Sequence, residues 1–178
     1  FSFFKLTILV TFLGPEMKST GEVMGVDKDY YCSLYKALIA SGLNIPSSGN
    51  VLLSVADRDK EKCVNIARKL LDLGFSLMAT EDTYHYLSNA GIESEFVSSE
   101  SVLDYIKRDK VTFIINTPTK GKIPSRMGFM LRRTAMEYSI PCITSLDTTN
   151  AVLEVLEHSI DKMDMNIYSL DEYSNYVK

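Results

Sequence analysis

The stretch VLLSVADRDKEKCVNIARKLLDLGFSLMAT, residues 51–80, contains the repeating unit of the fold. Val51–Val55 is apolar except for Ser54, as expected of a strand that is covered on both faces. The next segment carries apolar side chains at helical spacing: Cys63, Ile66, Ala67, Leu70 and Leu73. Gly74 ends this helix, and Phe75–Ala79 predicts a second strand. A strand, a helix and a strand in succession indicate a βαβ unit.

The same alternation continues along the chain. Further strands are predicted at Glu95–Val97, Val111–Asn116 and Ile140–Thr144, and helices at Glu81–Ala90, Val102–Arg108, from Pro124 onward and at Ser145–Glu157. Asp57 or Asp59 is expected to cap the helix that follows the first strand. Five strands separated by helices predict a Rossmann-like α/β fold, with three α/β/α layers around a five-stranded parallel sheet.

A boundary precedes this region. Asp27–Leu43 predicts a helix, and Pro46–Gly49 has the composition of a linker. We therefore expect a first part at residues 1–46 and an α/β domain at residues 47–178, with a short helix at Leu170–Tyr176. Phe1–Leu13 is strongly apolar but much shorter than the ~20 residues of a membrane span. We expect no membrane partner, and a chain that begins inside a larger protein.

Composition excludes several functions. Of the 178 residues, 46% are hydrophobic and 24% are charged, as in ordinary globular proteins. The net charge of -4 argues against a nucleic-acid partner, which would favour a basic surface. Three cysteines and two histidines at unrelated spacings predict no metal site, and Cys63 and Cys142 are expected to be buried, reduced thiols. This cysteine usage favours a cytoplasmic location.

Polar residues follow the predicted strands, where ligands of parallel sheets bind. These candidates for anion binding are Lys60, Thr80, Thr83, Asn116, Thr117, Thr119, Lys120 and Ser145. Each also has a plain structural interpretation: Lys60 pairs with Asp57 or Asp59, Thr80 and Ser145 cap helices, and the 117–123 loop is solvated. Arg132 and Arg133 are interpreted as surface charges near Glu137. No catalytic triad or close pair of carboxylates is visible, so the sequence predicts no catalytic residue.

Several segments resemble one family, the large subunit of carbamoyl phosphate synthetase. LGPEMKSTGEVMG (Leu13–Gly25) is similar to the end of its second ATP-grasp unit. Four further segments resemble the domain that follows this unit in the large subunit: GNVLLSVADRDKEK (Gly49–Lys62), LGFSLMAT (Leu73–Thr80), FIINTPTKGK (Phe113–Lys122) and IPCITSLDTTNAVLEVLE (Ile140–Glu157).

The resemblance implies a regulatory domain with the fold of methylglyoxal synthase. In many members of that family the domain binds a nucleotide effector such as UMP or IMP, which implies that it tunes carbamoyl phosphate synthesis for the pyrimidine and arginine pathways. The implied partners are the rest of the large subunit and a glutaminase small subunit, with oligomer contacts also expected. The ligase chemistry, with its ATP and Mg or Mn, belongs to the synthetase units, so no cofactor and no enzymatic activity are expected of this chain.

The resemblance also implies an effector site at Lys60, Thr80, Thr83, Asn116, Thr117, Thr119 and Lys120, the positions already selected by their place after the strands. Three features depart from the family pattern. Asp82 stands where a glycine is usual, Val97–Glu100 lacks a second lysine, and Cys142 replaces a tyrosine that some members use towards ornithine. Two alternatives stay open: a domain that has lost its ligand and serves packing, and, less favoured, a methylglyoxal synthase.

Overall fold

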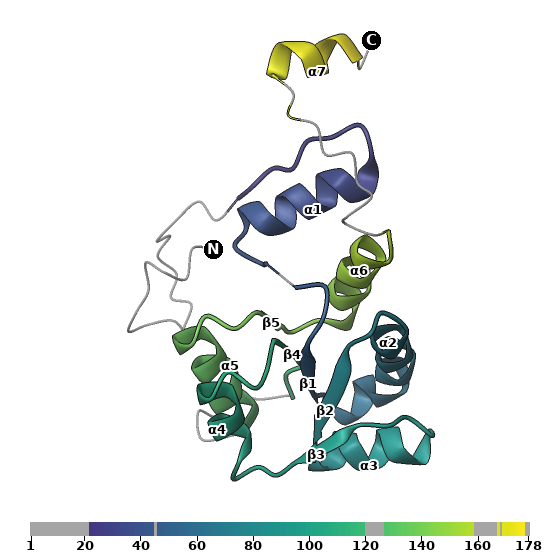
Figure 1. The fold of residues 1–178 in the computed structure, drawn as a ribbon, viewed down its shortest axis with the longest axis vertical. Helices are drawn as coiled ribbons and strands as arrows, with labels where there is room; N and C mark the ends of the chain where they lie inside the picture. Colours follow the sequence, from purple (N-terminus) through teal and green to yellow (C-terminus); the bar gives the residue numbers. More distant parts are fainter. Residues whose placement is uncertain (1–21, 45, 120–126, 159–166, 168, 177–178) are drawn as a thin grey trace.

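The computed structural model describes residues 22–44, 46–119, 127–158, 167 and 169–176. Their centre is one sheet of five parallel strands in the order β3-β2-β1-β4-β5 (Figure 1). The strands are β1 (Asn50–Ser54), β2 (Ser76–Thr80), β3 (Glu95–Val97), β4 (Phe113–Asn116) and β5 (Cys142–Ile143). The predicted number of strands and their parallel arrangement are confirmed.

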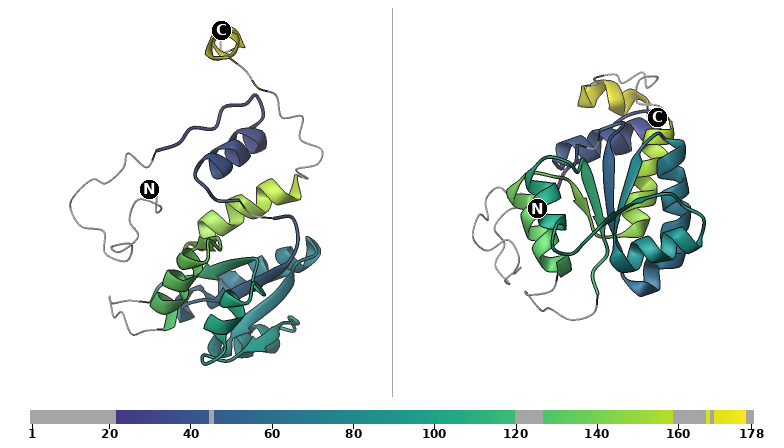
Figure 2. Two further views of the ribbon diagram at one scale, coloured as in Figure 1. Left: turned by 60° about the vertical axis from the view of Figure 1, so that its left-hand side comes forward. Right: turned by 60° about the horizontal axis from the view of Figure 1, so that its bottom comes forward.

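Helices cover both faces of the sheet, which makes the predicted three layers (Figure 2). The helices are α1 (Tyr30–Ala40), a 3-10 turn η2 (Asp57–Asp59), α2 (Lys60–Asp72), α3 (Glu81–Asn89), α4 (Val102–Lys107), α5 (Met127–Glu137), α6 (Leu146–Glu157) and α7 (Leu170–Tyr176). Side chains of α2, α3 and α6 pack on one face, and those of α4 and α5 on the other. None of the helices in the described ranges is long and apolar enough to cross a membrane.

The core follows the alternation of side chains along the central strands. Leu53 and Phe113 contribute to the cluster beneath α2, α3 and α6, whereas Leu52 and Ile114 contribute to the cluster beneath α4 and α5. β1 is the central strand, and its three buried residues, Val51, Leu52 and Leu53, are all apolar because the strand is covered on both faces. These consecutive apolar residues are the sequence signal of the central position.

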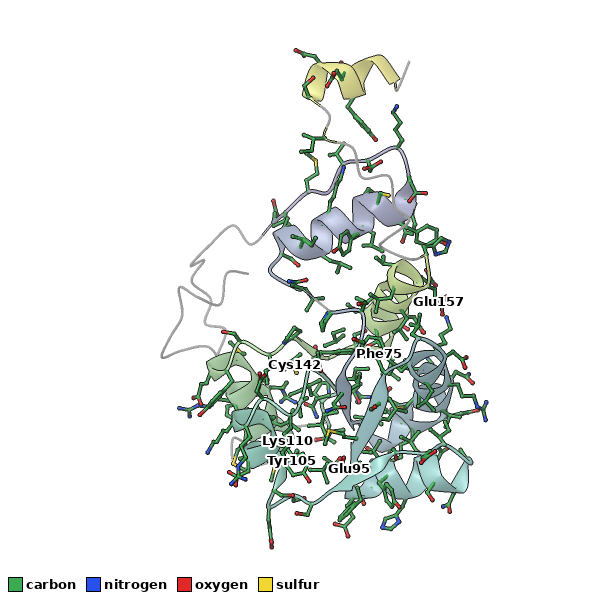
Figure 3. All side chains as sticks on the ribbon, viewed as in Figure 1. Phe75, Glu95, Tyr105, Lys110, Cys142 and Glu157 are labelled. Atoms are coloured by element: carbon green, nitrogen blue, oxygen red, sulfur yellow. The ribbon has the colours of Figure 1, made fainter. Side chains whose placement is uncertain are left out.

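Strand β5 is shorter than predicted, with two residues in place of five. The amide of Ile140 donates to the carbonyl of Ala135 at 2.8 Å, so Ile140 closes the end of α5. Pro141 follows and has no N–H to donate to a ladder. The strand therefore begins at Cys142, on the edge of the sheet (Figure 3).

The first helix is joined to the α/β domain through α6. The rings of Tyr31 and His158 stack with centroids 3.4 Å apart, which links α1 to the end of α6. Before α1, the buried Asp27 carboxylate accepts from Lys36 Nζ at 2.5 Å and from the Lys28 amide at 2.7 Å. The domain boundary at residues 46 and 47 stays a prediction.

Acid is expected to weaken this Asp27 contact. Burial raises the pKa of Asp27, but the hydrogen bonds from Lys36 and from the Lys28 and Asp29 amides outweigh burial, so its pKa lies below the ordinary 3.8. A carboxylate whose pKa is depressed by folding stabilises the fold above its unfolded pKa, and this stabilisation is lost as pH falls through the folded pKa. Denaturation by urea between pH 7 and pH 3 should therefore separate the wild type from Asp27→Asn at neutral pH. The difference should begin to shrink as pH falls below about 4, the unfolded pKa, and should vanish only below the lower folded pKa; a constant difference would contradict the role of the charge.

Candidate functional site

The candidate site lies at the carboxyl ends of β1 and β4. These strands are neighbours, with Ser54 opposite Asn116, although two strands and three helices separate them in the sequence. From β1 the chain builds β2 and β3 on one side and then returns to build β4 and β5 on the other. Ligands of open parallel sheets bind at such a reversal of strand order.

Two threonines cover the end of β1. The amide of Val55 donates to Thr83 Oγ1 at 3.1 Å, and the amide of Ala56 donates to Thr117 Oγ1 at 2.8 Å. Both threonines are buried, with 2% and 5% of their surface exposed. Because β1 has ended at Ser54, these hydroxyls satisfy two consecutive amides that the sheet ladder no longer reaches.

The same two hydroxyls keep their protons available. A threonine hydroxyl has one proton to donate and two lone pairs with which to accept. Within the described part of the chain, the hydrogen bonds of Thr83 and Thr117 use only the accepting side. Two fixed oxygens with unused O–H donors therefore lie at the carboxyl edge, an arrangement suited to an acceptor-rich group such as a phosphate.

Asn116 and Arg132 occupy the α5 side of the same edge. The Asn116 amide nitrogen donates to the Ser54 carbonyl at 2.9 Å, and its oxygen accepts a hydrogen bond from the Arg132 guanidinium. A Cβ at Gly128 would lie 3.4 Å from side-chain atoms of both Arg132 and Asn116, so the glycine is adjacent to this pair. After these two bonds, the Asn116 side chain keeps one N–H and one oxygen lone pair with which to orient a base or sugar.

The structure corrects the interpretation of the arginine pair. Arg133 forms the expected surface ion pair with Glu137, at 2.9 Å, but Arg132 points to Asn116 instead. The spacing contained a signal for this difference. Arg132 lies four residues after Gly128 and next to the buried Leu131, on the inward face of α5, whereas Arg133 lies one position further around the helix.

Lys60 opens α2, as predicted, and its ammonium lies 2.6 Å from the Asp57 carboxylate. The Lys60 side chain is only 13% exposed, while that of Asp57 is 92% exposed. The expectation that Asp57 or Asp59 caps α2 is wrong: Asp59 has the N-cap position without a side-chain bond, because Asp57 pairs with Lys60 and Asp59 with Arg58. The site therefore has a largely buried cation whose partner is exposed to solvent.

The remaining predicted site residues differ in how far the structure supports their interpretation. Thr80 has the N-cap position of α3, but its side chain makes no capping bond, so the capping interpretation is wrong. Ser145 caps α6 as interpreted, accepting from the Thr148 amide at 3.5 Å. Thr119 is exposed at the edge of the site. Lys120 and the predicted start of a helix at Pro124 lie outside the described residues, as does Phe1–Leu13.

The loops that follow β1 and β4 are bound to each other. The Arg58 guanidinium donates to the Pro118 carbonyl at 2.9 Å, near the bond between Ala56 and Thr117. Sequence reasoning did not select Arg58, because a hydrogen bond to a distant carbonyl leaves no local pattern. These two hydrogen bonds hold the loop after β1, which leads to Lys60, against the loop after β4, which contains Thr117.

The structure confirms the expected burial of Cys63 and corrects that of Cys142, which is only partly buried. Burial raises the pKa of Cys63 to about 12, with a further increase from Asp59. Burial also raises the pKa of Cys142 to about 12, although the nearby Arg132 acts in the opposite direction. A thiol with such a pKa is protonated at neutral pH and is a poor nucleophile. Among the described residues, no group of three or more His, Cys, Asp or Glu side chains is placed to hold a metal ion.

A hollow lies between α2 and α3. This open groove of about 460 Å³ is lined by Glu61, Val64, Asn65, Tyr86, Asn89 and Ala90. None of the predicted site residues lines it, and it lacks a cationic side chain. An anionic ligand therefore has less reason to bind there than at the carboxyl edge.

Comparison with known proteins is consistent with this fold. Residues 62–144 match the family model of the MGS-like domain. Among solved structures, the chain is similar to methylglyoxal synthase from Elizabethkingia anophelis NUHP1, with a TM-score of 0.50 and 15% identity over 75% of this chain and 93% of that one. A second similar structure is ForH, with a TM-score of 0.45 and 21% identity over 62% of this chain and 80% of that one. At 15% identity, the likeness to the synthase establishes the fold.

Proposed function

We propose that this chain, which contains an MGS-like domain, is the regulatory end of a carbamoyl phosphate synthetase large subunit and binds a nucleotide-type effector of the UMP or IMP class. The observation that carries the proposal is the pair of buried hydroxyls, Thr83 and Thr117, fixed by consecutive amides at the end of β1. The segments that resemble the synthetase family support the choice of parent enzyme.

The chemistry of the edge matches a phosphate. A phosphate accepts hydrogen bonds and carries negative charge. This edge offers the O–H donors of Thr83 and Thr117, and the Lys60 ammonium follows β1 at the start of α2. The first-turn amides of α3 support the same interpretation, because Thr80 does not cap them with its side chain. Free amides at a helix N-terminus favour an anion. Glu81 and Asp82, both exposed in that first turn, are the charges that oppose an anion there.

Regulation would act on the remainder of the parent enzyme. Effector binding shifts an equilibrium between states of the attached synthetase unit, through the segment that contains α1, and such coupling is typically ~1–3 kcal/mol. The rest of the large subunit and the glutaminase small subunit are the proposed partners. Carbamoyl phosphate synthesis, with its ATP and metal ions, takes place outside this chain, which we propose has no enzymatic activity of its own.

The placement of the histidines favours regulation over the synthase activity of the structural relative. Histidine is the side chain that most often serves in acid–base catalysis, and to do so it must lie within reach of the substrate. His85 is exposed on α3, and His158 stacks on Tyr31 at the end of α6. Neither histidine is among the groups that gather at the ends of β1 and β4.

Calorimetric titration of the full chain with UMP and with IMP tests the proposal. Lys60→Ala should weaken binding by roughly 10- to 100-fold, because it removes a charge-assisted contact worth about 1.5–3 kcal/mol. Lys69→Ala is the matched control, since Lys69 lies at the other end of α2 and pairs with Glu157 at 3.4 Å. Ornithine should give no heat, because Cys142 replaces the tyrosine of ornithine-binding members. A folded sample that binds neither nucleotide would contradict the proposed effector class.

A further inference from the structure

The Arg132 guanidinium is partly buried, and no carboxylate among the described residues forms an ion pair with it. Its side chain is half-buried, and its polar contact is with the neutral oxygen of Asn116. The arginines that form ion pairs in the described ranges are Arg58, Arg108 and Arg133, and Arg132 is not among them. A partly desolvated cation with no carboxylate beside it is costly, and an anion supplied by a ligand would compensate for this cost.

The position of Arg132 is fixed by a buried amide. Asn116 is 2% exposed, and its nitrogen is held by the Ser54 carbonyl at 2.9 Å, so its oxygen is directed to the guanidinium. A guanidinium has five N–H donors, and the contact with Asn116 leaves most of them for another acceptor. The planar fork of arginine suits the oxygens of a phosphate or carboxylate. Gly128 adds no side chain to this corner.

Lys60 and Arg132 approach the edge from opposite faces of the sheet. Lys60 begins α2, which packs with α3 and α6, while Arg132 lies on α5, which packs with α4. Both are at the carboxyl ends of the two central strands, β1 and β4. A ligand at the reversal of strand order would therefore have a cation on each side.

We propose that Arg132 is an anion-binding residue of this site, held in position by Asn116, and that it contacts an anionic oxygen group of the ligand from the α5 side. The inference rests on the proposed site and deepens it, because it makes the preferred ligand one that presents phosphate or carboxylate oxygens to that side. Asn116 is then a positioning residue, whose contribution to binding is made through Arg132.

The test uses inorganic phosphate as the probe, so that it does not depend on the identity of the effector. Thermal unfolding of the full chain is followed over a phosphate series at constant ionic strength, which gives an apparent Kd from the rise in Tm. The variants are Arg132→Met and Arg133→Met. Arg133 is the matched control, because its surface pair with Glu137 lies outside the site.

We expect Arg132→Met to weaken the apparent Kd for phosphate by roughly 10-fold or more, and Arg133→Met to leave it unchanged. Arg132→Lys should restore part of the affinity, because it keeps the charge without the fork. A merely structural Arg132 would lower Tm equally at every phosphate concentration. That result, or a wild type that phosphate does not stabilise, would overturn the inference.

The experiments distinguish a failure of the nucleotide effector proposal from a failure of the role proposed for Arg132. UMP or IMP binding that is as tight in Arg132→Met as in the wild type would leave the effector site intact and overturn the role of Arg132. Phosphate binding that depends on Arg132, in a chain that binds neither nucleotide, would support the anion site and reject the nucleotide class.

Discussion

Replacing Phe113 with alanine is expected to lower the free energy of unfolding by about 3–5 kcal/mol. Phe113 is fully buried in β4, and its ring meets the Phe75 ring edge to face, with centroids 5.6 Å apart and an angle of 87°. Removing the ring takes away apolar contacts and leaves a cavity between β4 and the helices α2 and α6. Loss of the aromatic pair adds to the effect. Urea denaturation followed by circular dichroism measures it.

Phe96 is the matched control for this change. It is also a phenylalanine in a strand, but it lies on the edge strand β3 and is 45% exposed. Phe96→Ala should therefore cost less than about 1.5 kcal/mol, because solvent can fill the space that the ring leaves. Equal losses in the two variants would contradict the placement of β4 at the centre of the sheet.

The double variant Thr83→Val, Thr117→Val is expected to lose about 2–6 kcal/mol of stability and nucleotide binding as well. Valine has the shape of threonine, so the change removes two hydroxyls with little change in packing. The amides of Val55 and Ala56 then stay buried without partners, and each unsatisfied group costs about 1–3 kcal/mol. The proposed ligand also loses two O–H donors.

Two comparisons separate these effects. Thr149 is buried in α6 and donates to the Ser145 carbonyl at 2.9 Å, so Thr149→Val removes a buried hydroxyl without leaving an amide unpaired. It should cost less than about 1.5 kcal/mol and leave binding unchanged. Thr83→Ser, Thr117→Ser keeps both hydroxyls and should retain binding. Loss of binding in the serine variant, or a Thr149→Val cost equal to that of the double variant, would reject the role given to the hydroxyls.

The fold could be predicted because its signals are local. Three consecutive apolar residues mark each of β1 and β4 as a buried strand, and the apolar stripe from Cys63 to Leu70 marks one face of α2. The element order then requires a parallel sheet with helices on both faces. Strand ends were less predictable, since β5 is shortened by Pro141 and by the closure of α5 at Ile140.

The site was predictable in place but not in detail. The rule that ligands bind beyond the carboxyl ends of parallel strands selected Thr83, Asn116 and Thr117, and the structure brings these three to the ends of β1 and β4. Their hydrogen bonds join residues 28 to 62 positions apart, so no local pattern specifies them. Arg132 was misjudged for a different reason: the nearby Glu137 suggested a surface pair, although the position of Arg132 next to the buried Leu131 places it on the face of α5 that meets Asn116.

An NMR titration that maps the amide signals perturbed by UMP would show whether a nucleotide binds at the carboxyl ends of β1 and β4. We expect the largest shifts where the buried hydroxyls and their amides lie, at Val55, Ala56, Thr83 and Thr117. Signals at the groove between α2 and α3, from Asn65 and Asn89, should stay in place. Shifts confined to that groove, or no shifts in a folded sample, would contradict a nucleotide site at the carboxyl edge.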